Sequence, residues 1–149
     1  METLDEKDME ILGLLKENSK LTTQQVSKKT LIPITTVHNR IKKMENLGVI
    51  KGYALNIDHK KLGKNITAIV LLTVSYMLPD GRKISQTELA KEIRKHPGVE
   101  EVNIVTGGSD IILKVRVESV EKLNDFIISD LREIGGVDKT QTMIVLSSF

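Results

Sequence analysis

The sequence contains no cysteine, so its 149 residues form no disulfide and offer neither a thiolate metal site nor a cysteine nucleophile. Long apolar runs are missing too. The longest, residues 68–72, is followed by Thr73 and falls far short of the roughly 20 residues that cross a bilayer. The N-terminus is acidic and lacks the apolar core of a signal peptide. We therefore expect a cytoplasmic protein with no membrane segment.

Charge is unevenly distributed along the chain, although the net charge is only +2. Between Lys20 and Lys51 there are seven cations and one anion, Glu45, whereas cations and anions number twelve each from Lys61 onward. A local excess of positive charge is typical of a surface that binds phosphates, and basic clusters also occur on ordinary surfaces. Hydrophobic residues at 40% and charged residues at 28% indicate a globular protein of one domain or two small ones.

The run of residues 33–53 is the most informative segment. Val37, Ile41 and Met44 are spaced four and three apart, which predicts a helix with one apolar face. Its opposite face carries hydroxyls, an amide and cations, namely Thr35, Thr36, His38, Asn39, Arg40, Lys42 and Lys43. Such a helix fits the major groove of DNA, and the alternative is a solvated amphipathic helix.

Two further helices are predicted before this one. A stripe at helical spacing predicts the first, over residues 5–18, and consists of Leu4, Ile11, Leu12 and Leu15. Acidic side chains fill its first turns, where the helix dipole favours anions: Asp5, Glu6 and Asp8. Thr22 or Thr23 caps a second helix that runs to about Lys29, with Val26 facing inward. Residues 30–32 then form the turn of a helix-turn-helix, without the glycine often found there.

The segment after the third helix is typical of a wing. Gly48 ends the helix, and residues 49–50 and 53–55 alternate as short extended segments around Gly52. Residues 1–52 are therefore predicted to be a winged helix-turn-helix domain that binds DNA.

Individual DNA contacts follow from side-chain chemistry. Arg40 pairs with a guanine edge or a phosphate, Asn39 reaches adenine, and His38 makes an uncharged contact. Hydroxyls and lysines supply phosphate or methyl contacts from Thr35, Thr36, Lys42, Lys43 and Lys51. This hypothesis requires Thr36, Arg40 and Lys43 to be open to a groove rather than packed against the protein.

From residue 64 the pattern changes to strands and helices that alternate. Strands are expected at residues 66–76, 99–106, 111–117 and 140–146, and helices at 86–95 and 120–134. The order βαββαβ is that of a ferredoxin-like domain, here 64–149, and residues 53–63 are expected to be a linker strand. The fold class is α+β.

A homodimer is expected from the first strand of this domain. Two helices cover only one face of such a sheet, yet residues 66–76 are apolar on both faces. A second copy of the chain is the simplest cover for the other face. The same topology occurs in RNA-recognition motifs, but none of the four aromatic residues, Tyr53, Tyr76, Phe126 and Phe149, lies in the two central strands. RNA binding by base stacking is therefore not expected.

The loop Gly107-Gly108-Ser109-Asp110 lies between the two strands that are central in chain order, 99–106 and 111–117. A hairpin turn explains it, because glycine supplies positive φ and aspartate bonds the backbone. Alternatively, its N–H groups hold a carboxylate and Asp110 holds an ammonium group. Thr140 and Thr142 either add hydroxyl contacts or are ordinary strand threonines.

Nothing in the sequence indicates an enzyme. His38, His59 and His96 fall in three different predicted elements, and none has metal-ligand spacing with another histidine. No serine or carboxylate sits in a catalytic motif, so we expect no catalytic residue, metal or cofactor.

Several motifs carry a family resemblance. Thr36-Val37, Arg40-Ile41-Lys42-Lys43-Met44-Glu45 and Gly48-Val49-Ile50-Lys51-Gly52-Tyr53, then Leu62-Gly63, together with residues 102–113, resemble the Lrp/AsnC (feast/famine) transcription regulators. The resemblance implies operator binding by the first domain. It also implies dimers that assemble further, often into octamers, with amino acids bound between dimers.

By the same resemblance, the effector loop is Thr106, Gly107, Gly108, Ser109 and Asp110, with Thr140 and Thr142 from the last strand. The connection 77–83 is longer than usual for the family, which alters the assembly interface or screens a ligand pocket.

The resulting hypothesis is a sequence-specific DNA-binding transcription regulator that responds to an amino acid or similar metabolite. The alternative is a small-molecule-sensing or assembly protein without specific DNA binding.

Overall fold

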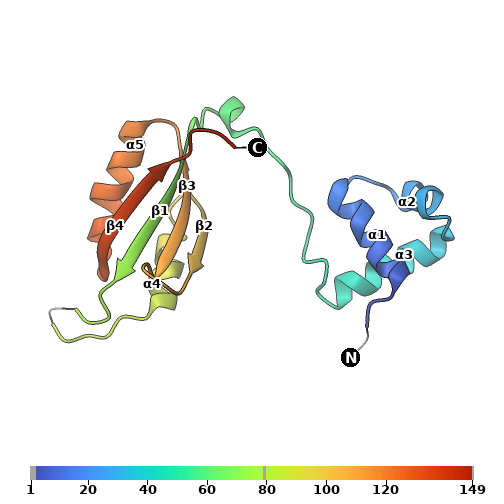
Figure 1. Ribbon diagram of the computed structural model, residues 1–149, viewed down its shortest axis with the longest axis horizontal. Coiled ribbons are helices and arrows are strands. Elements are labelled where there is room, and N and C mark those ends of the chain that lie inside the picture. The colour runs from blue at the N-terminus through green and yellow to red at the C-terminus, as the bar shows by residue number, and fades with distance from the viewer. Residues whose placement is uncertain (1–2, 79, 149) are drawn as a thin grey trace. The chain divides into compact units, whose positions relative to one another are not determined.

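The chain forms two units in the computed structural model, which describes residues 3–78 and 80–148. Pro79, in the connection 77–83, and Phe149 lie outside the described residues. The units are Met1–Asn56 and Ile57–Phe149 (Figure 1). The division falls inside the segment 53–63 that we predicted as a linker, and the domain bounds 1–52 and 64–149 stay predictions. In the described part of the chain, no helix has the length and apolarity to cross a membrane.

The first unit contains three helices, α1 (Glu6–Glu17), α2 (Thr23–Thr30) and α3 (Ile34–Asn46). Thr22 caps α2, because its hydroxyl accepts a hydrogen bond from the Gln25 backbone N–H. The helices pack on the apolar stripes that the sequence predicted, with a core of Ile11, Leu15, Val26, Ile32, Val37 and Met44. The three-helix prediction is therefore confirmed.

The turn between α2 and α3 contains the one non-glycine residue of the described chain with a positive φ. Leu31 has φ of 58° and its side chain is 91% exposed. The left-handed conformation costs a residue with a side chain about 1–2 kcal/mol. Leu31, which stands where a glycine is often found in such a turn, is therefore a site of backbone strain.

The end of α3 follows the prediction, but the wing does not form strands. Gly48 has φ of 70°, its N–H donates to Glu45 O, and the N–H of the next residue donates to Met44 O. These two bonds close the helix in a Schellman motif. Residues 51–58 have neither helix nor strand, so the two extended segments expected around Gly52 do not pair. A 3-10 helix, His59–Leu62, replaces the end of the expected linker strand.

The second unit is a four-stranded antiparallel sheet with helices on one face (Figure 1). Its elements are β1 (Ile66–Val74), α4 (Gln86–Ile93), β2 (Val99–Ile104), β3 (Ile111–Val117), α5 (Val120–Asp125) and β4 (Val137–Ile144). The strand order is β2-β3-β1-β4, with β3 and β1 central. The βαββαβ, ferredoxin-like prediction is confirmed.

Several element ends differ from the prediction. Strands β1 and β2 end two residues early, at Val74 and Ile104, and α4 ends at Ile93. Strand β4 begins at Val137 instead of residue 140, because the chain enters it directly from the turn at Gly135-Gly136. These shifts leave the topology unchanged.

The helix α5 continues as a π-helical segment, Phe126–Leu131, which changes the predicted core. We expected Val120, Leu123, Ile127, Leu131 and Ile134 to form one buried stripe. Leu123, Phe126 and Leu131 are buried, whereas Ile127 and Ile134 are partly buried against the core and Val120 is half exposed. The π turn places the buried Phe126 and Leu131 five residues apart.

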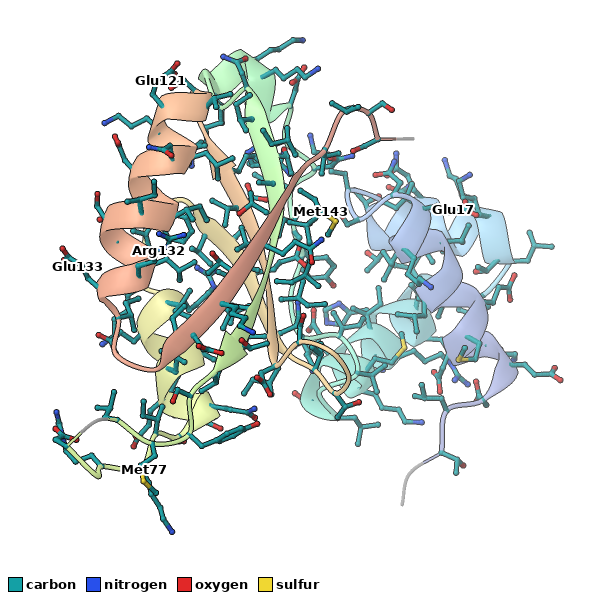
Figure 2. The ribbon with its side chains drawn as sticks, turned by 60° about the vertical axis from the view of Figure 1, so that its left-hand side comes forward. Glu17, Met77, Glu121, Arg132, Glu133 and Met143 are labelled. Carbon is teal, nitrogen blue, oxygen red and sulfur yellow. The ribbon has the colours of Figure 1, made fainter. Side chains whose placement is uncertain are left out.

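The face of the sheet opposite the helices is only partly covered. Along β1, Ala68, Val70, Leu72 and Val74 are buried against the helices, and the alternate residues Ile69 and Leu71 face the other way. Their neighbours on that side are Ile112 and Met143, by strand register. Figure 2 shows Met143 on the side of the sheet away from α5, and this side chain is 44% exposed. We call these four side chains, Ile69, Leu71, Ile112 and Met143, the open face.

Candidate nucleic-acid interface and effector loop

Helix α3 has three faces rather than the two that the sequence suggested. Val37 and Met44 are fully buried and Ile41 is partly buried in the core. An exposed strip runs along the helix at spacings of three and four: Thr35, His38, Asn39 and Lys42. We call this strip the recognition face. The third face consists of Thr36, Arg40 and Lys43, which are half-buried.

The third face is bound to α1 through a buried carboxylate. Asp8 is the one fully buried charged residue of the described chain, with 0% exposure. Arg40 Nη1 donates to Asp8 Oδ1 and to both oxygens of Asp5, each at 2.7 Å. Lys43 Nζ lies 3.4 Å from Asp8 Oδ2. We call Asp5, Asp8, Arg40 and Lys43 the Asp8 cluster.

A capping box fixes the two carboxylates at the start of α1. The Asp5 carboxylate accepts from the Asp8 N–H at 2.9 Å, and the Asp8 carboxylate accepts from the Asp5 N–H at 3.1 Å. Their side-chain oxygens therefore point toward α3 from a rigid helix end. The acidic first turn was explained from sequence by the helix dipole, but its acids also hold the cations of α3.

The charged groups of the Asp8 cluster shift one another's pKa values. Burial by itself raises the pKa of Asp8, but hydrogen bonds from Arg40, the Asp5 backbone and Lys43 outweigh burial and lower it. The hydrogen bond from Arg40 lowers the pKa of Asp5, and the hydrogen bonds to Asp5 and Asp8 raise the pKa of Arg40. All three groups are therefore held in their charged forms.

This cluster corrects the requirement for Arg40 and Lys43, which are bound to the protein rather than open to a groove; Thr36 is partly buried and outside the cluster. Arg40 is 22% and Lys43 29% exposed, because a buried carboxylate needs a cation beside it. The Nε of Arg40 is buried without a hydrogen-bond partner among the described residues. Base contact by Arg40 stays a prediction, and the geometry favours an internal role. Lys51 is exposed, as expected.

The predicted effector loop begins after β2 and ends at Asp110, beside the end of β1. Thr106, Gly107 and Gly108 are exposed, while Ser109 and Asp110 are partly buried. The Asp110 N–H donates to Leu72 O at 2.9 Å, and Val74 N–H donates to the Asp110 carboxylate at 2.8 Å. Gly107 has φ of 130°, as a turn glycine requires. The loop therefore has the structure of a hairpin turn fastened to β1.

Thr140 and Thr142 lie on one face of β4, as their spacing predicted. Their register partners on β1 are Leu72 and Val70, which belong to the buried face. Thr140 is therefore one strand away from the attachment of Asp110 to Leu72. Whether either hydroxyl contacts a ligand stays a prediction.

The histidines and acids of the described chain do not converge. His59 pairs with Glu100 at 3.5 Å and His96 with Asp130 at 2.8 Å, in separate parts of the second unit. Within residues 3–78 and 80–148, no three His, Asp or Glu side chains group in a way that could hold a metal ion.

Comparison with known proteins identifies both units. The family description "Lrp/AsnC ligand binding domain" matches residues 67–149, and "Winged helix-turn-helix DNA-binding" matches residues 4–51. An uncharacterized HTH-type transcriptional regulator of Pyrococcus furiosus is 43% identical over 143 residues, 96% of this chain and 93% of that protein. HTH-type transcriptional regulator FL11 of the same organism is 34% identical, over 96% of this chain and 89% of its own length.

Two solved structures of transcriptional regulators have the same fold over almost the whole chain. A transcriptional regulator of Neisseria meningitidis in complex with L-Met matches with a TM-score of 0.87 and 25% identity, over 97% of this chain and 91% of that one. LrpC of Bacillus subtilis matches with a TM-score of 0.84 and 28% identity, over 99% and 98%.

A winged helix-turn-helix unit followed by a ligand-binding domain defines a DNA-binding transcriptional regulator that responds to small molecules. The chain belongs to the Lrp/AsnC family. Because this family consists of transcription regulators, the prediction that the chain is not an enzyme is confirmed.

Proposed function

We propose that the recognition face of α3, made of Thr35, His38, Asn39 and Lys42, enters the major groove of operator DNA. The observation that supports this assignment is the separation of the α3 faces: these four side chains are exposed, whereas Arg40 and Lys43 are bound to Asp8. An asparagine amide matches the adenine edge, and a lysine matches guanine or a phosphate.

Arg40 and Lys43 act as positioning residues in this proposal. They hold α3 against the start of α1, and so fix the angle at which the recognition face is presented. Thr36, on the same face as these two residues, and Lys51, just beyond the helix, contact phosphates.

The open face is the surface through which two copies pair. It contains four apolar side chains on a sheet that helices cover on its other face only. A two-fold dimer presents two copies of α3 to half-sites about one helical turn apart, in a roughly palindromic operator. Further assembly of dimers, up to an octamer, is part of the same proposal, as is a location in the cytoplasm with the DNA.

The second unit binds an amino acid or a similar metabolite at the loop 106–110, with Thr140 and Thr142 beside it. The relative from Neisseria meningitidis was crystallised with L-Met, and its chain has the same fold as this one. The exposed Thr106, Gly107 and Gly108 offer backbone N–H groups to a ligand carboxylate.

Selection of bound fragments from random DNA, with and without each amino acid, provides the operator for a quantitative test. Asn39→Ala is expected to weaken operator binding by about 1–3 kcal/mol and random-DNA binding much less. Lys42→Ala is expected to weaken both, and to reduce the slope of log affinity against log salt by about one if it contacts a phosphate. Asn124→Ala, at an exposed position of α5, is the matched control and should change neither. Equal losses for Asn39→Ala on operator and random DNA would contradict base recognition.

A further inference from the structure

The carboxylate of Asp110 is bound by three donors from its own unit. Val74 N–H donates to Oδ2 at 2.8 Å, the Tyr76 hydroxyl donates to Oδ1 at 2.9 Å, and Gln86 Nε2 donates to Oδ1 at 3.0 Å. These donors belong to the last residue of β1, the start of the connection to α4, and the first residue of α4. One carboxylate therefore ties three separate elements to the loop 106–110.

Little acceptor capacity remains on this carboxylate. An ionised carboxylate has about four acceptor positions, and two on Oδ1 and one on Oδ2 are already in use. A ligand ammonium group brings three N–H donors. To bind Asp110 with more than one of them, it must displace a donor that is present now.

Of the three donors, Tyr76 is the one that can leave most easily. The Val74 bond comes from the backbone of a central strand, so breaking it disturbs the sheet. Gln86 Nε2 is bonded to Asp110 Oδ1 and also lies 2.8 Å from the Tyr76 hydroxyl oxygen. The Tyr76 side chain is more than half exposed, so its ring can turn into water without opening a cavity. The hydrogen bond to Asp110 also raises the pKa of Tyr76, which keeps the phenol protonated as a donor.

The backbone of Tyr76 is held in place by contacts that do not involve its ring. Tyr76 O accepts from the Ile84 N–H at 3.0 Å, and Met77 pairs with Lys83 in a β-bridge. Ile84 in turn fits closely over Gly136, because a Cβ at that glycine would clash with Ile84 Cδ1. A turn of the Tyr76 side chain therefore breaks none of these backbone contacts.

We propose that Tyr76 is a latch on the ligand loop: its hydroxyl occupies the position on Asp110 that the ammonium group of a ligand takes. Binding replaces the phenol by the ammonium group, so Tyr76 lowers the affinity of a ligand by the cost of the exchange, while Asp110 requires the free amino group. This inference rests on the proposed effector function of the loop and assigns to it a residue that sets ligand affinity.

The chain offers a spectroscopic test, since it has two tyrosines and no tryptophan. Tyr53→Phe leaves Tyr76 as the one tyrosine, and a tyrosine that donates to a carboxylate fluoresces weakly. Adding Asp110→Asn to this background is expected to raise the emission. Unchanged emission would show that the hydroxyl does not sit on Asp110 and would overturn the latch without any ligand.

The ligand arm uses calorimetry on the full chain with each of the twenty common L-amino acids, and with the N-acetyl form of any that binds. Tyr76→Phe is expected to bind about threefold to tenfold more tightly than wild type, the value of one exchanged hydrogen bond. Tyr53→Phe, the matched control, should bind as wild type does, and its Tyr76 emission should rise on binding. Wild type, Tyr76→Phe and Tyr53→Phe should all fail to bind the N-acetyl form.

Each outcome separates the latch from the effector function. Binding to Tyr76→Phe but not to wild type supports the latch, because it then closes the site. Equal affinity of wild type and Tyr76→Phe, or no change of emission on binding, overturns the latch and leaves the effector function standing. No binding to any variant overturns the effector function and the latch with it, even if Asp110→Asn raises the emission.

Discussion

Replacing Asp8 by asparagine removes the charge at the centre of the Asp8 cluster while keeping the side-chain shape. In the native unit this buried carboxylate accepts from Arg40 Nη1 at 2.7 Å and from the Asp5 N–H at 3.1 Å, with Lys43 Nζ 3.4 Å away. The introduced amide would turn either its oxygen or its NH2 group toward Arg40, and two cations would lose their anion.

The cost follows from burial and from what the cations retain. Removing one partner of a buried ion pair costs about 3–5 kcal/mol. Arg40 keeps Asp5, and both Arg40 and Lys43 are partly exposed, so water recovers part of this loss. We therefore expect Asp8→Asn to lower the free energy of unfolding of the first unit by about 2–3 kcal/mol, within the range of about 1.5–3 kcal/mol for a hydrogen bond to a charged group.

Urea unfolding measures this in a Tyr76→Phe background, where Tyr53 is the one tyrosine and its emission reports the first unit. The Tyr53 hydroxyl donates to Glu45 on α3 at 3.0 Å, so unfolding changes its surroundings. Glu10→Gln, at an exposed position of α1, is the matched control and should stay within about 0.5 kcal/mol of the parent. If Asp8→Asn costs no more than Glu10→Gln, the cluster does not hold α3 in place and the positioning role of Arg40 is wrong.

Three further predictions concern acid, the turn and the dimer. Because the folded pKa of Asp8 lies below its unfolded value of about 3.9, its stabilisation is complete above that pH and is lost as the pH falls through the folded pKa. The urea concentration at the unfolding midpoint of the first unit should therefore decrease as the pH is lowered below about 4. This decrease should be smaller in Asp8→Asn. Leu31→Gly relieves the left-handed strain at a loss of backbone entropy, for a net gain of about 0.5–1 kcal/mol in urea unfolding. Its control, Leu47→Gly at a right-handed position, should destabilise. Leu71→Asp on the open face should give monomers in analytical ultracentrifugation, whereas Ile128→Asp, an exposed apolar position on the helix side, should not.

Each of these has a contradicting result. If the urea midpoints of wild type and Asp8→Asn depended on pH in the same way, the lowered pKa of Asp8 would be contradicted. A loss of stability in Leu31→Gly would mean that the turn is not strained. Dimers that persist in Leu71→Asp would place the interface elsewhere.

Much of the fold was predictable because periodicity records burial directly. Strand β3 was predicted at its observed bounds, since Ile111, Leu113, Val115 and Val117 alternate into the core. The π-helical segment was not predictable in this way. A stripe at the usual spacing of four runs back from Leu131 through Ile127 to Leu123 and passes over Phe126, so Phe126 was overlooked as a core residue.

The candidate interface was predicted in composition but not in arrangement. Hydrophobicity alone could not distinguish which polar side chains of α3 face solvent and which face α1. A signal was present: Leu4, Asp8, Ile11 and Leu15 follow the spacing of an apolar stripe, so Asp8 is a carboxylate at a core position. A buried carboxylate requires a cation beside it. Arg40 and Lys43, on helix α3, supply the positive charge.

The latch depends on contacts that no local pattern encodes. Tyr76, Gln86 and Asp110 are up to 34 residues apart and meet only because β1 and β3 are adjacent in the sheet. The sequence indicated a long connection at residues 77–83. It did not indicate that Tyr76, the residue just before this connection, reaches the loop 106–110.

The most direct test of the account is a change of operator preference. Asn39→Arg replaces a side chain that matches adenine by one that matches guanine, at the centre of the recognition face. Fragments selected from random DNA by this variant should differ from those of the wild type at one base position in each half-site, from adenine to guanine, and agree elsewhere. An unchanged selected sequence would show that the exposed strip of α3 does not recognise the bases.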